Sequence, residues 1–140
     1  MSEYHHMGEK LPQQPESYWI KALNLPTFSP LKEDKQVDVV IVGGGITGIT
    51  VAFLLVNEGL KVAILEADSV LNGTTGHTTA KITAQHGLIY DELIQNTDLA
   101  TAKLYYEANK EALQFIRDTV EKQSISCDLQ KQDAYVYATT

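Results

Sequence analysis

The chain has 140 residues, of which 44% are hydrophobic and 21% charged. This is the size and composition of one globular domain, long enough to bury a sizeable core, and it excludes a disordered chain. The 18 acidic and 11 basic residues give a net charge of −7, which argues against nucleic acid or an anionic membrane surface as the main partner. Cys127 is the single cysteine, so the chain alone can build neither a disulfide nor a multi-cysteine metal centre, and we predict no metal ligands.

The N-terminal residues are polar and lack the apolar centre of a signal peptide. Residues 39–57 carry no charge and approach the length of a membrane span. Three successive glycines would weaken a lipid-exposed helix there, and the segment divides into a β-branched half and a helical half. We therefore expect no membrane association and a cytoplasmic location.

Residues 1–36 contain all four prolines and the single tryptophan, Trp19. Prolines at this density prevent long helices and central strands. We predict a proline-rich N-terminal arm over residues 1–36 that docks partly on the rest of the chain, with Tyr18, Trp19 and Ile20 as its anchor. The alternative is a disordered leader.

Residues 37–66 show the strongest pattern in the chain. The β-branched run at 37–42 predicts a buried strand, the apolar residues at 46–58 predict a packed helix, and 61–65 predict a second strand. Gly59 stands where a helix C-cap belongs. Strand, helix and strand make a compact Rossmann-like βαβ unit, which places the chain in the α/β class.

The rest of the chain has fewer strand signals. Residues 67–87 lack regular periodicity and predict a long loop of functional importance or disorder. A short helix is expected at 88–95, a long amphipathic helix at 98–123 with Thr97 or Asp98 as its N-cap, and a third strand at 134–138. Because a complete dinucleotide fold needs five or six parallel strands, we expect residues 37–140 to form an incomplete sheet with a long helix.

Gly43, Gly45 and Gly48 form the pattern G-x-G-x-x-G between the first strand and the helix. In this context the first glycine permits a tight turn, the second lets a diphosphate approach the backbone, and the third lets the helix pack closely on the strand. The backbone N–H groups around Ile46 and Thr47 are expected to face the anion. No G-K-[ST] follows, which excludes a Walker-type loop.

Glu66 ends the second strand, eighteen residues after Gly48. A carboxylate there can accept both hydroxyl hydrogens of an adenosine ribose and would repel a 2′-phosphate, which disfavours NADP. Taken singly, the glycines are also compatible with an ordinary glycine-rich turn, and Glu66 is also compatible with a solvated acid at the end of a strand. Together they predict dinucleotide binding, while the residues alone leave FAD and NAD open.

The segment from Val37 to Ala67, followed by GTTGHTTAKIT, resembles the FAD-dependent oxidoreductases of the D-amino-acid oxidase and glycine oxidase group. The resemblance implies FAD as the cofactor and a threonine-rich loop that runs along the diphosphate and ribityl chain toward the flavin ring. The motif and the resemblance together predict fifteen cofactor-binding residues: Gly43, Gly45, Ile46, Thr47, Gly48, Glu66, Ala67, Gly73, Thr74, Thr75, His77, Thr79, Ala80, Lys81 and Ile82.

Three stretches, at residues 11–19, 73–90 and 127–139, resemble more closely a bacterial subfamily that carries a C-terminal Rieske iron–sulfur domain. This resemblance implies that electrons pass on to a downstream Rieske centre. Lys81 departs from the pattern, because many glycine-oxidase-like proteins have glycine there. Members of the family are longer and bind a small-molecule substrate in a later domain. We therefore expect an N-terminal fragment, inactive alone, whose unpaired sheet edge favours self-association.

The predicted function is the FAD-binding segment of a flavin-dependent oxidoreductase of amine or amino-acid oxidase type, with hydride transfer to FAD. The alternatives are an NAD-linked dehydrogenase domain and a non-catalytic nucleotide-binding fragment. Catalytic residues are not identified. Lys81 could support a reduced flavin, and His77 could attach it covalently, but a surface lysine and noncovalent FAD are favoured. Cys127 is interpreted as a small residue associated with a strand, and the tyrosines as packing residues.

Overall fold

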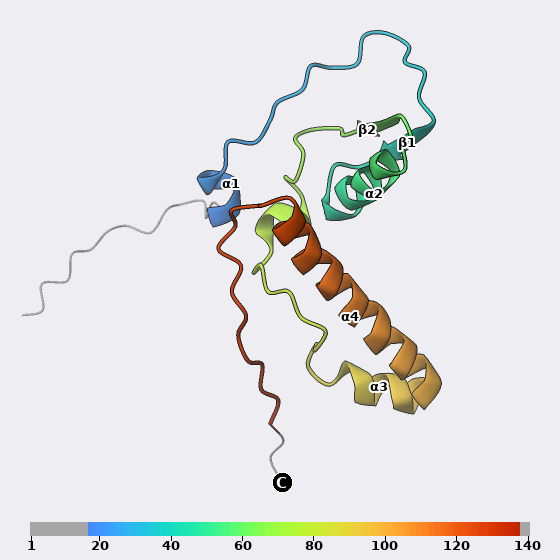
Figure 1. The fold of residues 1–140 in the computed structure, drawn as a ribbon, viewed down its shortest axis with the longest axis vertical. Coiled ribbons are helices and arrows are strands. Elements are labelled where there is room, and N and C mark those ends of the chain that lie inside the picture. Colours follow the sequence, from blue (N-terminus) through green and yellow to red (C-terminus); the bar gives the residue numbers. More distant parts are fainter. Residues whose placement is uncertain (1–16, 138–140) are drawn as a thin grey trace, which may run out of the picture. The chain divides into compact units, whose positions relative to one another are not determined.

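The computed structural model describes residues 17–137, and these fall into two compact units (Figure 1). The first unit ends at Thr79 and the second begins at Ala80. Much of the predicted arm, including the LPQQPE part of its family-like stretch, lies outside the described residues.

The first unit is built on a βαβ unit: β1 (Val39–Val42), α2 (Ile46–Asn57) and β2 (Val62–Leu65). The strands are parallel, with Val39 beside Val62 and Val42 beside Leu65. Gly59 follows the helix with φ +83°, the left-handed conformation that ends helices. The predicted strand–helix–strand order and parallel pairing are confirmed, with bounds that differ by at most two residues.

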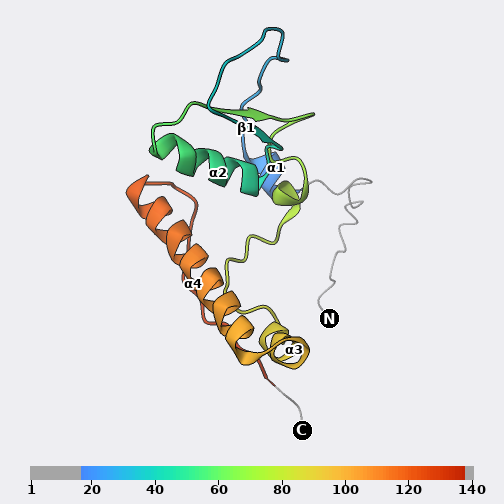
Figure 2. The ribbon, with the colours of Figure 1, turned by 90° about the vertical axis from the view of Figure 1, so that its right-hand side faces the viewer.

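Helix α2 packs on one face of the two-stranded sheet (Figure 2). Val39 and Ile41 are half-buried, whereas Val40 and Val42, which alternate with them, are 53% and 85% exposed. Within residues 17–137, β1 has a strand partner on one edge alone. The expectation of an incomplete sheet is therefore confirmed for this part of the chain. Parallel sheets are normally covered on both faces, but one face of this sheet is uncovered.

A short helix, α1 (Tyr18–Ala22), precedes the sheet, and a single 3₁₀ turn, η1 (Thr74–His77), follows it. The two pack against each other within the first unit (Figure 2). Trp19 donates to the Thr78 carbonyl and Ile20 contacts Gly76, so these two residues dock as predicted. Tyr18, the third predicted anchor, is 72% exposed and meets the Trp19 ring edge-on. The helical form of this segment was not expected, and it fits in the interval between Pro15 and Pro26.

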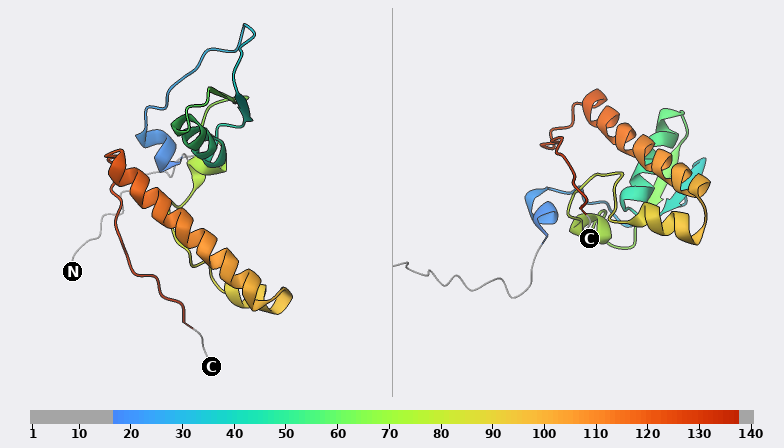
Figure 3. Two further views of the ribbon diagram at one scale, coloured as in Figure 1. Left: turned by 45° about the vertical axis from the view of Figure 1, so that its right-hand side comes forward. Right: turned by 90° about the horizontal axis from the view of Figure 1, so that it is seen from below.

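The second unit holds α3 (Ile89–Asn96) and α4 (Leu99–Lys122), which pack against each other near the start of α4 (Figure 3). The Tyr90 ring meets those of Tyr105 and Tyr106 edge-on, with centroids 6.1 and 5.9 Å apart. The Tyr90 hydroxyl donates to the Ala84 carbonyl, and burial, with the two neighbouring tyrosines, raises its pKa. These three rings pack as predicted, and the Tyr90 hydroxyl is hydrogen-bonded within the chain.

Three expectations about the fold are wrong. Residues 134–137 form no strand, because no strand lies beside them to complete the hydrogen-bond ladder; residue 138 lies outside the described residues. Cys127 is exposed and belongs to no strand. The expected sizeable core is not formed: among residues 17–137, Ala102 is the one buried hydrophobic residue, because α2 covers only one face of a two-stranded sheet and α3 covers only one end of α4. No helix in the same range is long and apolar enough to span a membrane.

Candidate cofactor-binding site

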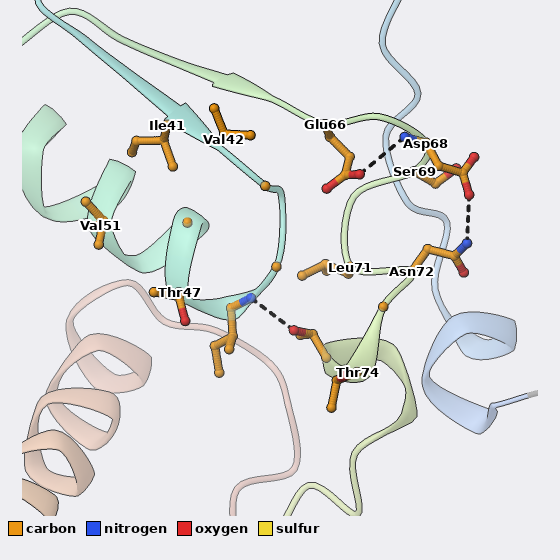
Figure 4. A pocket seen from close by; sticks show the side chains of 16 residues that line it. Ile41, Val42, Thr47, Val51, Glu66, Asp68, Ser69, Leu71, Asn72 and Thr74 are labelled. Carbon is orange, nitrogen blue, oxygen red and sulfur yellow. Dashed lines mark hydrogen bonds between the residues drawn. The ribbon is translucent and has the colours of Figure 1, made fainter.

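A pocket of about 700 Å³ opens where β1 turns into α2 (Figure 4). This volume is in the usual range for small-molecule sites. Three segments of the first unit line it: the end of β1 with the start of α2, the residues after β2, and the turn η1. The lining residues are Ile41, Val42, Gly43, Gly45, Ile46, Thr47, Gly48, Val51, Glu66, Asp68, Ser69, Leu71, Asn72, Gly73, Thr74 and Thr75.

The three glycines of the motif serve distinct geometric needs. Gly43 has φ +106°, a conformation that side chains rarely adopt, and it turns the chain out of β1. A Cβ on Gly48 would lie 2.0 Å from the Gly43 carbonyl oxygen, so only glycine lets α2 approach the strand this closely. A Cβ on Gly45 would lie 3.3 Å from Thr75 Oγ1, at the pocket wall. The turn and the close packing predicted from the spacing are therefore present.

Gly44, which stands between the motif glycines, was missed as a structural position. It is buried, and a Cβ there would lie 2.9 Å from Val70 Cγ1 and 3.2 Å from Glu66 Oε2. Its backbone N–H donates to Glu66 Oε2 at 2.6 Å. The G-x-G-x-x-G pattern treats this position as variable, so the contact with the acid could not be read from the motif.

The start of α2 presents backbone donors to the pocket. Within residues 17–137, the N–H groups of Gly45, Thr47 and Gly48 have no recorded partner, as expected for the first turn of a helix. The Ile46 N–H differs from the prediction, because it donates to Thr75 Oγ1 at 3.0 Å. The Thr75 hydroxyl therefore accepts from one of the backbone N–H groups that were expected to face the anion.

Glu66 lies at the other end of the pocket, just after β2 (Figure 4). Its carboxylate accepts from the backbone N–H groups of Gly44 at 2.6 Å, Ala67 at 2.8 Å and Asp68 at 3.2 Å. These bonds hold the pKa of Glu66 below the usual range, and the bond from Gly44 contributes most. The group is therefore ionised at neutral pH and acts only as an acceptor. A carboxylate has about four acceptor positions, so it retains capacity for a ligand hydroxyl.

The loop after Glu66 contributes pocket residues that sequence reasoning missed: Asp68, Ser69, Leu71 and Asn72. Asn72 Nδ2 donates to Asp68 Oδ2 at 3.0 Å (Figure 4). Leu71 has φ +64°, and its N–H donates to the Gly44 carbonyl at 2.9 Å, which ties the loop to the glycine turn. Their position directly after the predicted ribose acid was the one signal for them, because no recognisable spacing marks them.

The remaining predicted residues divide into two groups. Gly73, Thr74 and Thr75 line the pocket. Ala67 is not part of the lining, but its N–H donates to Glu66 Oε1 at 2.8 Å. His77 does not line the pocket; its Nδ1 lies 2.9 Å from the Gly73 carbonyl oxygen and donates to it. Thr79, at the end of the first unit, is not part of the lining either. The same holds for the three residues that the family resemblance places beside the flavin ring, which lie at the start of the second unit: Ala80, Lys81 and Ile82.

The pocket offers the chemistry that a dinucleotide requires. Main-chain donors without an obstructing side chain lie at the helix start, where the helix dipole favours an anion. A carboxylate that stays ionised lies where a ribose would donate its hydroxyl hydrogens. The described residues contain no group of three or more acidic, histidine or cysteine side chains that could hold a metal ion. The donor set thus fits a diphosphate joined to a ribose.

The chain is similar to several oxidoreductases over most of its length. It is 52% identical over 125 residues to a Bacillus subtilis protein named as a Rieske 2Fe-2S iron-sulfur protein, a match covering 89% of this chain and 25% of that protein. It is 27% identical over 121 residues to the gamma-glutamylputrescine oxidoreductase of Escherichia coli, covering 86% and 28%. It is 42% identical over 62 residues to an aerobic glycerol-3-phosphate dehydrogenase of Staphylococcus epidermidis, a shorter match that covers 44% of this chain and 11% of that protein.

The chain therefore spans about a quarter of the length of the curated relatives that it matches most fully. No solved structure matches it. Residues 38–140, which include the glycine turn, Glu66 and the threonine-rich segment, match the DAO family of FAD-dependent oxidoreductases. This match selects FAD over NAD, which the turn alone could not do. The chain belongs to the DAO family of FAD-dependent oxidoreductases.

Proposed function

We propose that the pocket between β1, α2 and η1 holds the ADP half of FAD. The observation that carries the proposal is the joint placement of open main-chain donors and an ionised Glu66 in one pocket. These are the two chemistries that separate a nucleotide with a diphosphate from other small molecules. The fold supplies both without a basic side chain, in keeping with the acidic composition.

The diphosphate is assigned to the start of α2. Its oxygens would accept from the N–H groups of Gly45, Thr47 and Gly48, next to the positive end of the helix dipole. Thr75 supports this assignment, although its hydroxyl already accepts from the Ile46 N–H. A hydroxyl that accepts one hydrogen bond can still donate its own proton, so Thr75 offers the anion a further donor.

The adenosine ribose is assigned to Glu66. Its carboxylate is kept ionised by three backbone N–H groups, of which that of Gly44 contributes most. With three of its roughly four acceptor positions filled by backbone N–H groups, the carboxylate can accept from one of the two ribose hydroxyls. The same negative charge would repel a 2′-phosphate. Asp68, which also lines the pocket, adds to that repulsion.

The flavin end is proposed from the family resemblance. His77, Thr79, Ala80, Lys81 and Ile82 are assigned to the chain that follows the ribityl group and passes the ring. FAD, when bound, supplies the hydride acceptor; the residues of this chain bind and orient it. No residue described here is assigned a catalytic role.

For the whole protein we propose oxidation of a small molecule whose binding residues lie in a further domain. The E. coli relative is named for an amine, which favours a C–N bond as the site of oxidation; the Staphylococcus relative is named for an alcohol. The relative named as a Rieske protein supports electron transfer to a downstream iron–sulfur centre. An iron–sulfur signal from the full-length protein, lost when the downstream segment is removed, would test this. The division into an arm at 1–36 and a domain from 37, and the cytoplasmic location, remain predictions.

The binding of nucleotide is tested with Glu66→Gln, which keeps the shape of the side chain and removes its charge. We expect affinity for FAD and for 5′-ADP to fall about ten- to a hundredfold, because hydrogen bonds to a charged acceptor are lost. Wild type should prefer 5′-ADP to 2′,5′-ADP, and the variant should lose much of that preference. Titration calorimetry measures both.

Glu58→Gln is the matched control, since Glu58 is an exposed glutamate at the far end of α2. It should leave both affinities unchanged. Equal affinities in wild type and Glu66→Gln would remove Glu66 from the site. An absence of flavin absorbance in the purified full-length protein, together with no 5′-ADP binding, would contradict the proposed function itself.

A further inference from the structure

The helix α1 and the turn η1 are connected by three contacts between residues far apart in the sequence. The Ser17 hydroxyl donates to the Gly76 carbonyl, and Trp19 Nε1 donates to the Thr78 carbonyl at 2.7 Å. Ile20 packs against Gly76, where a Cβ would lie 2.9 Å from the Ile20 side chain. The helix and its N-cap residue Ser17 therefore contact the turn at its middle, Gly76, and just after its end, at Thr78.

The segment η1 is only one 3₁₀ turn long. It has no side-chain N-cap; the Gly76 N–H donates to the Gly73 carbonyl at 3.1 Å, and His77 Nδ1 lies 2.9 Å from the same oxygen. Short 3₁₀ segments have poor hydrogen-bond geometry and depend on their surroundings. Gly76 is buried, and a Cβ there would also lie 2.5 Å from the Leu71 carbonyl oxygen. The turn is thus enclosed between α1 on one side and the loop after Glu66 on another.

The opposite side of the same turn faces the pocket. Gly73, Thr74 and Thr75 line it, and Thr75 Oγ1 accepts from the first N–H of α2 (Figure 4). A displacement of the turn would therefore move Thr75 relative to the donors assigned to the diphosphate. Thr75 is one residue from Gly76, so the contact from α1 is transmitted to it through one peptide unit.

We propose that α1 is a positioning element for cofactor binding, with Ser17, Trp19 and Ile20 as positioning residues that hold η1 against the diphosphate end of the pocket. This inference rests on the proposed function. It assigns a role in binding to a segment that precedes residue 38, where the family match begins. The helix acts through the turn and makes no contact with the pocket, because none of its residues is part of the pocket lining.

The test compares Trp19→Phe and Ser17→Ala with Tyr18→Phe in the full chain. The first two remove one donor to the turn each; the third removes a hydroxyl from a 72%-exposed residue while keeping the ring that meets Trp19 edge-on. Hydrogen exchange of flavin-free protein, read on peptides covering residues 73–79, should become about two- to tenfold faster in the first two variants. It should not change in Tyr18→Phe.

Binding of 5′-ADP and adenosine separates positioning from general loss of structure. In Trp19→Phe and Ser17→Ala, affinity for 5′-ADP should fall severalfold while affinity for adenosine stays constant, because only the diphosphate end is disturbed. Unchanged exchange in residues 73–79 would overturn the proposal. So would equal loss of both ligands, or faster exchange with undiminished 5′-ADP affinity. If the full-length protein shows neither flavin absorbance nor 5′-ADP binding, the proposed function fails, and the exchange comparison still decides whether α1 holds the turn.

Discussion

At the scale of single residues, Glu66 combines a structural and a binding role. Its carboxylate accepts from Gly44, Ala67 and Asp68, and so fixes the glycine turn against the end of β2. The same bonds keep it charged for a ligand. The motif spacing predicted the ligand role but not the link to Gly44, because that link depends on how the two strand ends lie side by side.

The lowered pKa of Glu66 predicts how nucleotide binding depends on pH. A group whose pKa is depressed in the folded protein contributes its stabilisation above the usual glutamate pKa and loses it as the pH falls through the lowered value. We therefore expect the advantage of wild type over Glu66→Gln in 5′-ADP affinity to stay level from neutral pH down to the usual glutamate range and to decline only below it, because protonation of the ligand's own phosphate affects both proteins alike. Calorimetric titration across this range in wild type and Glu66→Gln measures the effect.

The Glu66→Gln variant is the reference, because its side chain has no proton to gain. A loss of the wild-type advantage that begins near neutral pH would contradict the assignment, since it would indicate a protein group other than Glu66. Histidine protonation is the main alternative in that range.

At the scale of elements, α4 illustrates how local signals define a helix. Asp98 accepts from the Thr101 N–H at 2.7 Å, and this bond, with weaker help from Ala100, lowers the pKa of Asp98. The apolar repeat was readable from the sequence, which predicted a helix from residue 98 with Thr97 or Asp98 as its N-cap. The helix starts one residue later, at Leu99, and Asp98 is the cap.

Asp98→Ala should fray the first turn of α4. We expect the amides of its first turn to exchange roughly fivefold faster, because the cap no longer satisfies the Thr101 N–H. Asp98→Asn keeps an acceptor at the same position and should restore slow exchange. Equal protection in wild type and Asp98→Ala would show that packing against α3, rather than the cap, fixes the start of the helix.

At the scale of the whole molecule, the amount of exposed apolar surface stands out. Val40, Val42, Leu54 and Leu104 are all large hydrophobic residues that are more than two-fifths exposed. The relatives are more than three times as long as this chain. We propose that further strands and layers of a longer protein cover the open edge and face of β1.

For the chain on its own, the open edge predicts self-association. Val40→Lys places a charge on the uncovered face of β1 and should lower the apparent mass in sedimentation at a given concentration. Leu104→Lys is the control, because it puts the same charge on a 73%-exposed residue of α4. An equal effect of both substitutions would indicate general hydrophobic association, and a monomeric wild type would contradict the prediction.

The sequence by itself determined the βαβ unit, the glycine turn, the acid at the end of β2 and the two later helices, since each of these depends on local periodicity, capping and turn chemistry. Only the tertiary structure decided that Thr75 accepts from the Ile46 N–H, that the Gly44 N–H donates to Glu66, and that α1 packs against η1. These contacts join residues 22 to 59 positions apart, and no local pattern encodes which distant groups meet. The same reason explains the incorrect strand at 134–138, because a strand exists only where a partner completes its hydrogen bonds.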